Sequence, residues 1–159
     1  MFPVQQPRRM TAQEQADYAN ILPTVPNLAN LWVLGPETQT YNCLAWSLGI
    51  TFSWIWPWQG NVSQAQFDLL YNALGDPPQV AATGVAGYGL ANNQRTHASV
   101  RLNVTAAPAA GGPVGVSWTS KLGRLLLVTH GHHELDNDPD YGTIQGYYQQ
   151  NNGPSVTNP

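Results

Sequence analysis

The feature that most constrains the fold is the separation of helical and strand patterns along the chain, because helical patterns end near residue 77. The clearest helix is predicted in VSQAQFDLLYNALG, residues 62–75. Ser63 and Gln66 form a capping box there, and Gly75 provides a C-terminal stop. The apolar residues of one helix face recur at the i, i+3, i+4, i+7 spacing, and they are Phe67, Leu70, Tyr71 and Leu74.

The other predicted elements place helices before strands. A helix is predicted over residues 11–22, from a capping box at its start to Pro23 at its end, and a short strand at LWVL, residues 31–34. After residue 77, Gly, Pro and Asn clusters separate predicted strands at 79–84, 97–104, 114–120, 125–130 and 142–149. We expect a flexible connection at 103–115. This order predicts one α+β domain over residues 1–150, followed by a polar, disordered tail at 151–159.

Composition limits the partners that the chain can have. Only six residues are Lys or Arg and the net charge is −3, so the chain lacks a basic face for nucleic acid. One cysteine cannot form an internal disulfide, and the fold therefore depends on its hydrophobic core. The polar N-terminus predicts no cleavable signal peptide, and the run LLLV at 125–128 is too short for a membrane span. Any secretion is expected to use a route without such a leader.

The only cysteine lies in QTYNCLAWSLG, residues 39–49. This stretch is too continuously apolar for a surface helix, and Gly49 offers a left-handed stop, so we predict a short buried helix that begins at or near Cys43. The N–H groups and dipole of a helix N-terminus favour a thiolate. Cys43 is therefore a candidate nucleophile, with its own N–H and the side chain of Gln39 or Asn42 as candidate oxyanion donors.

The candidate base is the histidine of THASVRL. Alternation along this strand places His97, Ser99 and Arg101 on one face and Ala98, Val100 and Leu102 on the other. A histidine at a strand edge, packed by the cysteine helix, has the geometry that a Cys–His pair requires.

The group that orients this base stays open. The acidic run ELDNDPDYG offers Glu134, Asp136, Asp138 and Asp140 as orienting groups, and the neutral competitors are Ser117, Thr119 and Ser120.

Structural interpretations compete with these functional ones. His130, His132 and His133 are bunched like metal ligands, but no second cysteine accompanies them, so we interpret them as a solvated loop and expect no metal ion and no cofactor. A free cysteine is usually a small hydrophobic core residue, and a lone strand histidine is usually structural. The tryptophans at positions 46, 54, 56 and 58 are most simply core and rim residues, although they are also suited to a substrate groove.

Four blocks resemble, in order, those of a papain-like fold family: YNCLAWSLG, THASVRL, WTSKLG and, after a histidine, DYGTIQGYY. That family includes TecA-type bacterial effectors, which are delivered by type VI secretion and deamidate Rho GTPases with a Cys–His–Asp triad. The resemblance covers residues 39–148 and implies a papain-like fold, with the cysteine helix packed on an antiparallel sheet. It implies Cys43 and His97 as the first two triad residues, with Asp140 as first choice and Asp138 as second choice for the aspartate.

The resemblance also implies a function. The chain is expected to be a secreted effector toxin and virulence factor that acts in the cytoplasm of the target cell. Its expected reaction converts an Asn or Gln side-chain amide of a host Rho-family GTPase to a carboxylate. Three alternatives stay open: a cysteine peptidase or amidase with the same residues, a transferase that uses an amine in place of water, and a non-catalytic binding module that uses the Trp-rich segment 54–58.

Overall fold

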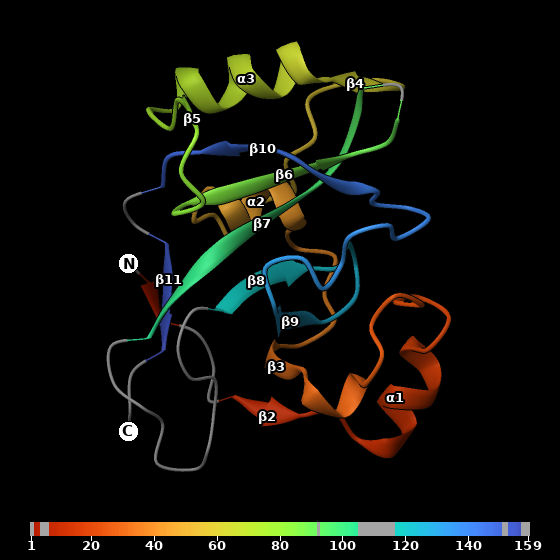
Figure 1. The fold of residues 1–159 in the computed structure, drawn as a ribbon. Coiled ribbons are helices and arrows are strands. Elements are labelled where there is room, and N and C mark those ends of the chain that lie inside the picture. Colours follow the sequence, from red (N-terminus) through yellow and green to blue (C-terminus); the bar gives the residue numbers. More distant parts are fainter. Residues whose placement is uncertain (1, 4–6, 92, 105–116, 151–152, 157–159) are drawn as a thin grey trace.

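The strands of this computed structural model form a mainly antiparallel sheet around the long strand β7 (Gln94–Val104) (Figure 1). The structure describes residues 2–3, 7–91, 93–104, 117–150 and 153–156. The main path of the sheet runs in the order β2 (Arg8–Arg9), β3 (Trp32–Gly35), β9 (Leu127–His130), β8 (Ser117–Lys121), β7, β6 (Val85–Gly89), β10 (Thr143–Tyr148) and β5 (Pro78–Gln79).

Three short strands lie off this path. β4 (Val62–Ser63) pairs antiparallel with the start of β7. β11 (Pro154–Val156) pairs parallel with the end of β7 and also with β1 (Phe2–Pro3). The pairing of β11 shows that residues 154–156 are ordered, so the expectation of a disordered tail is wrong for this part of it. The backbone groups of the segment complete the β7 edge, which satisfies their hydrogen bonds without any apolar sequence pattern.

Each helix begins directly after a side chain that caps it, namely Thr11, Asn27, Asn42 or Ser63. The helices are α1 (Ala12–Tyr18), the 3-10 helix η1 (Leu28–Asn30), α2 (Cys43–Ser47) and α3 (Gln64–Ala73). Both predicted capping boxes are present, at Thr11 and at Ser63. Gly49 and Gly75 follow α2 and α3 with φ of +77° and +83°, the left-handed conformation that ends a helix.

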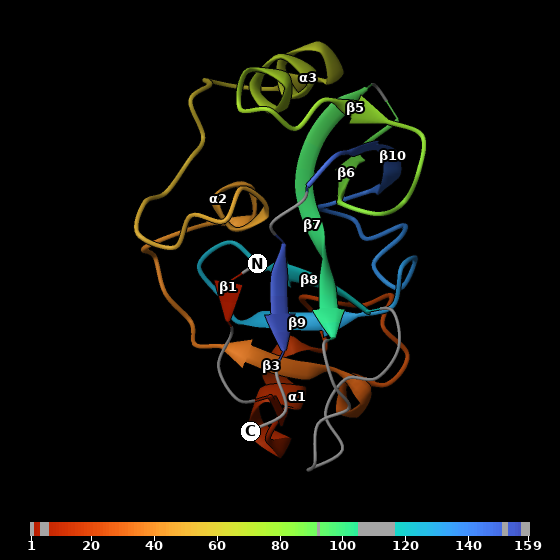
Figure 2. The ribbon, with the colours of Figure 1, turned by 90° about the vertical axis from the view of Figure 1, so that its left-hand side faces the viewer.

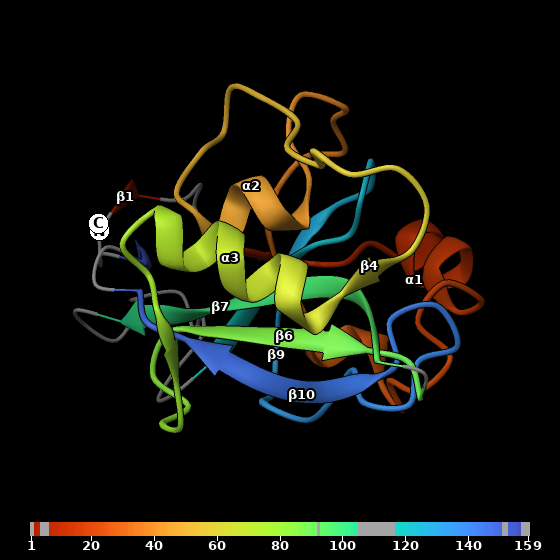
Figure 3. The same ribbon diagram turned by 90° about the horizontal axis from the view of Figure 1, so that it is seen from above.

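Two apolar clusters pack on the sheet. The first cluster lies between α2, α3 and β7 and includes Leu44, Phe67 and Val100; seen from above, α3 lies over α2 (Figure 3). The Tyr71 hydroxyl and Ser47 Oγ join the two helices at 2.5 Å; because Ser47 donates its own proton to Leu44 O, Tyr71 is the donor. The second cluster lies around α1, at the end of the molecule opposite α3 (Figures 1 and 2). Each fully buried side chain of this size contributes roughly 1.5–3 kcal/mol, so these clusters stabilise a fold that has no internal disulfide.

The mainly antiparallel sheet with a few helices agrees with the predicted α+β class. The predicted short strand at 31–34 corresponds to β3, and the later predictions correspond to β7, β8, β9 and β10. Residues 105–116, which hold most of the predicted flexible connection, lie outside the described residues. Within the described ranges, no helix is both long and apolar enough to cross a membrane.

Three local predictions were wrong. The helix predicted over 11–22 ends at Tyr18, and the residues after it form turns. Leu74, assigned to the apolar face of α3, is 54% exposed because it lies at the C-terminal cap of that helix. The predicted strand 79–84 falls between β5 and β6. β6 ends at Gly89, where a Cβ would lie 2.6 Å from Gln94 O, so this glycine permits a close backbone approach.

Candidate active site

Asn42 determines how Cys43 is presented at the first turn of α2. Asn42 Oδ1 accepts hydrogen bonds from the N–H groups of Ala45 (3.1 Å) and Ile55 (3.2 Å). Its Nδ2 donates to Ile55 O at 2.7 Å. One buried side chain therefore caps the helix and attaches the tryptophan-containing loop to its tip.

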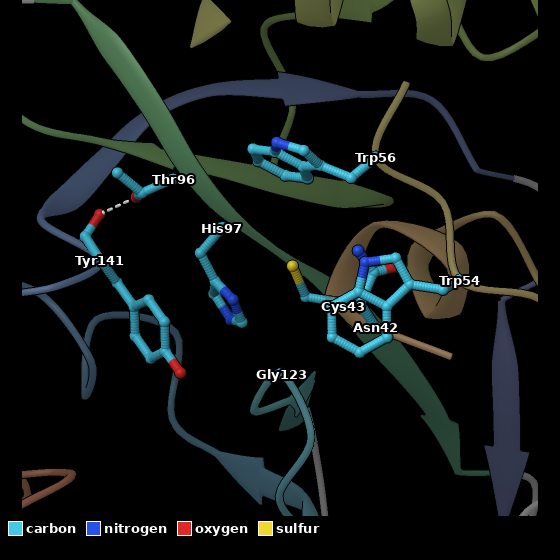
Figure 4. Close-up of a pocket in the computed structure, with 8 residues that line it drawn as sticks. All are labelled: Asn42, Cys43, Trp54, Trp56, Thr96, His97, Gly123 and Tyr141. Atoms are coloured by element: carbon cyan, nitrogen blue, oxygen red, sulfur yellow. Dashed lines mark hydrogen bonds between the residues drawn. The ribbon is translucent and has the colours of Figure 1, made fainter. Parts of the chain in front are cut away.

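A pocket of about 320 Å³ lies at this helix tip. It is lined by Asn42, Cys43, Trp54, Trp56, Thr96, His97, Gly123 and Tyr141. Figure 4 shows the Cys43 sulfur directed into the space between His97 and Trp56. The structure thus brings the candidate nucleophile and the candidate base to one pocket, although they lie on different elements. Among the described residues that line the pocket, none is Asp, Glu, Lys or Arg.

The Cys43 thiol is buried, with 6% of the residue exposed. Burial raises the pKa of Cys43 to about 11, although hydrogen bonding from the backbone N–H groups of Ala98, Leu44 and Cys43 itself acts to lower it. At neutral pH the thiol therefore keeps its proton. The helix N-terminus was expected to favour a thiolate, but in the resting protein desolvation outweighs the effect of the N–H groups.

His97 enters the pocket from β7, with one ring nitrogen bonded and one unpaired. Its Nε2 lies 2.9 Å from Ser120 Oγ, whereas its Nδ1 is buried and has no hydrogen-bond partner. The ring stacks on Tyr141, with ring centroids 4.2 Å apart, and Thr96 holds Tyr141 by donating to its carbonyl oxygen. Burial, followed by the nearby His130, lowers the pKa of His97 to about 3, so the resting imidazole is neutral.

Ser120 and His130 continue the hydrogen bonding away from His97. Ser120 Oγ lies 2.7 Å from His130 Nε2, and His130 Nδ1 lies 2.7 Å from the carbonyl oxygen of Gly131. His130 is only 3% exposed at the end of β9, so its assignment to a solvated loop was wrong. Ser120 was one of the neutral competitors for orienting the base. The β7–β8 pairing ends at Val100–Thr119, and His97 and Ser120 both lie beyond that point, where their side chains meet.

The two aspartates proposed for a triad serve another purpose or face solvent. Asp138 is buried, and its Oδ1 accepts from the N–H groups of Asp140 (2.8 Å) and Tyr141 (3.1 Å). Asp140 itself is exposed. Neither carboxylate is bonded to His97, because Nε2 is bonded to Ser120 and Nδ1 has no partner. Asp138 instead shapes the turn that delivers Tyr141 to the pocket.

A comparison with family models places this site in a family. Residues 32–149, most of the chain, match the model described as a domain of unknown function (DUF7689). The chain belongs to the DUF7689 family. The candidate nucleophile Cys43 and the candidate base His97 lie within the matched DUF7689 segment, as do Ser120 and His130. No curated protein and no solved structure matches the chain.

Other predicted positions of the DUF7689 domain lie away from the pocket. Gln39 is exposed and is not one of the pocket-lining residues. His132 Nε2 is 2.9 Å from the Tyr147 hydroxyl, and His133 Nδ1 is 2.7 Å from Asp136 Oδ2. Among the described residues, no group of three or more His, Cys, Asp or Glu side chains is arranged to hold a metal ion.

Lys121 is a site-proximal residue of the DUF7689 domain that the sequence analysis missed. Its buried Nζ donates to Thr38 O (2.9 Å) and to Gly123 O (2.5 Å), and it lies 5.1 Å from the ring centroid of Tyr41. It therefore ties the segment before Cys43 to the pocket wall at Gly123. Burial lowers the pKa of Lys121 to about 8. The signal for it was a lysine at an inward position of an otherwise buried strand, β8.

Proposed function

We propose that this DUF7689 domain is a cysteine-dependent amide hydrolase that deamidates a protein side chain. The observation that carries the proposal is the shared pocket, in which the Cys43 thiol and the unpaired Nδ1 of His97 are both present. A buried nucleophile beside a neutral imidazole nitrogen is the arrangement that proton transfer and thioester chemistry require. The proposed pair contains no aspartate.

The first half-reaction follows from the resting protonation states. His97 Nδ1 accepts the thiol proton as the Cys43 sulfur attacks the carboxamide carbon, so the new S–C bond and the proton transfer form together. The electron pair of the C=O bond moves to oxygen. The backbone N–H of Cys43 is the proposed donor to that oxygen, since Gln39 is exposed and the Asn42 side chain already holds the loop.

The second half-reaction returns the protein to its starting state. The imidazolium of His97 gives its proton to the departing nitrogen, and ammonia leaves as the thioester forms. Water then attacks the thioester carbonyl while His97 takes its proton. The C–S bond breaks, the sulfur regains a proton, and the net change is amide plus water to carboxylate plus ammonium.

The pocket walls support a neutral substrate group. Because none of the described residues that line the pocket is Asp, Glu, Lys or Arg, a charged side chain entering it would lose hydration without gaining an ionic partner among them. Trp54 and Trp56 offer apolar contact to the stem of an Asn or Gln side chain. The choice of a Rho-family GTPase, and of delivery as an effector, rests on the motif resemblance alone. A new carboxylate in such a target alters its local electrostatics.

The test is incubation of the full chain with Rho-family GTPases, followed by intact-mass and peptide analysis. We expect the mass change of an amide-to-acid conversion with the native chain and none with Cys43→Ala or His97→Ala. Losing the base alone lowers the rate by about 10²–10⁴. Backbone cleavage in the same spectra would favour a peptidase, and incorporation of an added amine would favour a transferase. Unmodified GTPases would refute the proposed substrate.

A second candidate, a non-catalytic binding module, is favoured by one observation. Phe52 is 81% exposed and Trp54 is 42% exposed, so the loop after α2 presents aromatic surface to solvent. Under this alternative, Cys43→Ala keeps the full biological effect of the chain, whereas Phe52→Ser removes it. The hydrolase proposal requires the loss in Cys43→Ala.

A further inference from the structure

We propose that Ser120 and His130 are positioning residues, which set the tautomer of His97 so that the lone pair of Nδ1 faces the pocket that holds Cys43. The catalytic consequence rests on the proposed function, whereas the proton arrangement stands on the hydrogen bonds alone. All three side chains are buried, with at most 3% of each residue exposed. They come from β7, β8 and β9, and they meet where the β7–β8 pairing has ended.

His97, Ser120 and His130 form a chain of hydrogen bonds, called the relay below. The proton positions in it can be assigned from the His130 end. The carbonyl oxygen of Gly131 only accepts hydrogen bonds, so His130 Nδ1, 2.7 Å away, carries a proton. His130 is neutral because its burial favours the uncharged ring, and its Nε2 therefore presents a lone pair. The Ser120 hydroxyl is the group 2.7 Å from that lone pair, so it donates to His130.

The serine then decides the state of His97. Ser120 Oγ donates its only proton to His130. It therefore accepts a hydrogen bond from its other neighbour, His97 Nε2, 2.9 Å away. In a neutral imidazole only one nitrogen carries a proton, so His97 Nδ1 is bare. This nitrogen is also the buried ring atom without a partner, and His97 shares the pocket with the Cys43 thiol. The relay thus presents a base to the thiol without any carboxylate.

The same hydrogen bonds suit both states of the proposed reaction. When Nδ1 takes a proton, Nε2–H continues to donate to Ser120, and no group in the relay has to turn. The ring plane is held by Tyr141, whose centroid is 4.2 Å away at an interplanar angle of 22°, and by Tyr88 at 5.2 Å. Such preorganisation reduces the rearrangement needed as charge develops.

The first test reads the tautomer directly in the unaltered chain. Nitrogen-15 NMR of the imidazoles distinguishes protonated from bare ring nitrogens, and the His97 signals are identified by their loss in His97→Gln. We expect a protonated Nε2 and a bare Nδ1 for His97, with the reverse arrangement, a protonated Nδ1, for His130. A protonated Nδ1 on His97 overturns the proposal.

The second test measures the rate at which iodoacetamide alkylates Cys43, which is the only thiol in the chain. Near neutral pH, Ser120→Ala is expected to lower the alkylation rate by at least tenfold, approaching the loss in His97→Gln. The matched control is Thr119→Val, which removes a buried hydroxyl from the same strand that is bonded to Trp46 and Val100 and not to the relay. Its rate is expected to stay within about twofold of the native rate.

Two substitutions at His130 distinguish a positioning role of this residue from a packing role. His130→Gln keeps an acceptor near the place of Nε2 and is expected to retain both the His97 tautomer and the alkylation rate, whereas His130→Leu loses both. Equal losses in Thr119→Val and Ser120→Ala, or equal rates in His130→Gln and His130→Leu, overturn the proposal. If the tautomer and the Ser120 effect are present but no amide is hydrolysed, only the proposed function fails.

Discussion

Acidification from about pH 7.5 to about pH 5 is expected to destabilise the protein through its two buried histidines. In the folded state, burial lowers the pKa of His97 to about 3 and that of His130 to about 4. In the unfolded state both return to about 6.5. Because the unfolded chain binds protons that the folded chain excludes, the free energy of unfolding falls as the pH falls through 6.5, and the loss ends only near the folded pKa values.

The magnitude follows from these values. At about pH 5 each unfolded histidine is almost fully protonated and each folded one is almost fully neutral, which removes about 2 kcal/mol per histidine, or about 4 kcal/mol for the pair. His132, whose pKa is also lowered by burial, adds to the loss in the same direction. The window stays above the ordinary pKa of carboxyl groups, near 4, so Asp and Glu contribute little to it.

The assay is urea unfolding, followed by tryptophan fluorescence, at several pH values across this window. The matched variant is His130→Gln, in which the acid-dependent loss is expected to shrink by about 2 kcal/mol. A native loss below about 1 kcal/mol, or an unchanged pH slope in His130→Gln, would refute the conclusion that both imidazoles are buried and neutral.

Three further substitutions test the site and the core. Asp140→Asn is expected to leave the alkylation rate of Cys43 unchanged and stability within about 0.5 kcal/mol, because this carboxylate is exposed; a large fall in alkylation would restore an aspartate triad. Asn42→Ala is expected to lower the free energy of unfolding in urea by about 1–2 kcal/mol, because the amide caps α2 and holds Ile55. It is also expected to increase acrylamide quenching of the tryptophan-containing loop. Quenching equal to that of the native chain would contradict this role. Phe67→Ala is expected to cost about 3–5 kcal/mol in the same unfolding assay, because this ring is fully buried; a loss below about 1 kcal/mol would show that it is not in the core.

The sequence predicted the parts of the site that depend on neighbours along the chain. The start of α2 at Cys43 was predicted from the apolar run and the Gly49 stop, and the structure adds Asn42 as its cap, all of which act within about one helical turn. Strand alternation correctly placed Ala98 and Val100 on one face, which packs in the core with α2, but it did not predict that His97, on the other face, shares a pocket with Cys43. The choice of Asp140 or Asp138 came from the motif resemblance, whereas in the structure Asp138 accepts hydrogen bonds within its own turn and neither carboxylate is bonded to His97.

The orienting group and the state of the thiol were decided only by the tertiary structure. Ser120 lies 23 residues from His97 and 10 from His130 along the chain, and nothing local distinguishes it from Ser117 or Thr119. The side chains meet because three strands converge where the β7–β8 pairing ends. Helix and strand patterns act over a few residues. They therefore determined that Cys43 starts a helix and that His97 lies on a strand. Their protonation depends on water being excluded by distant segments, and that exclusion exists only in the folded chain.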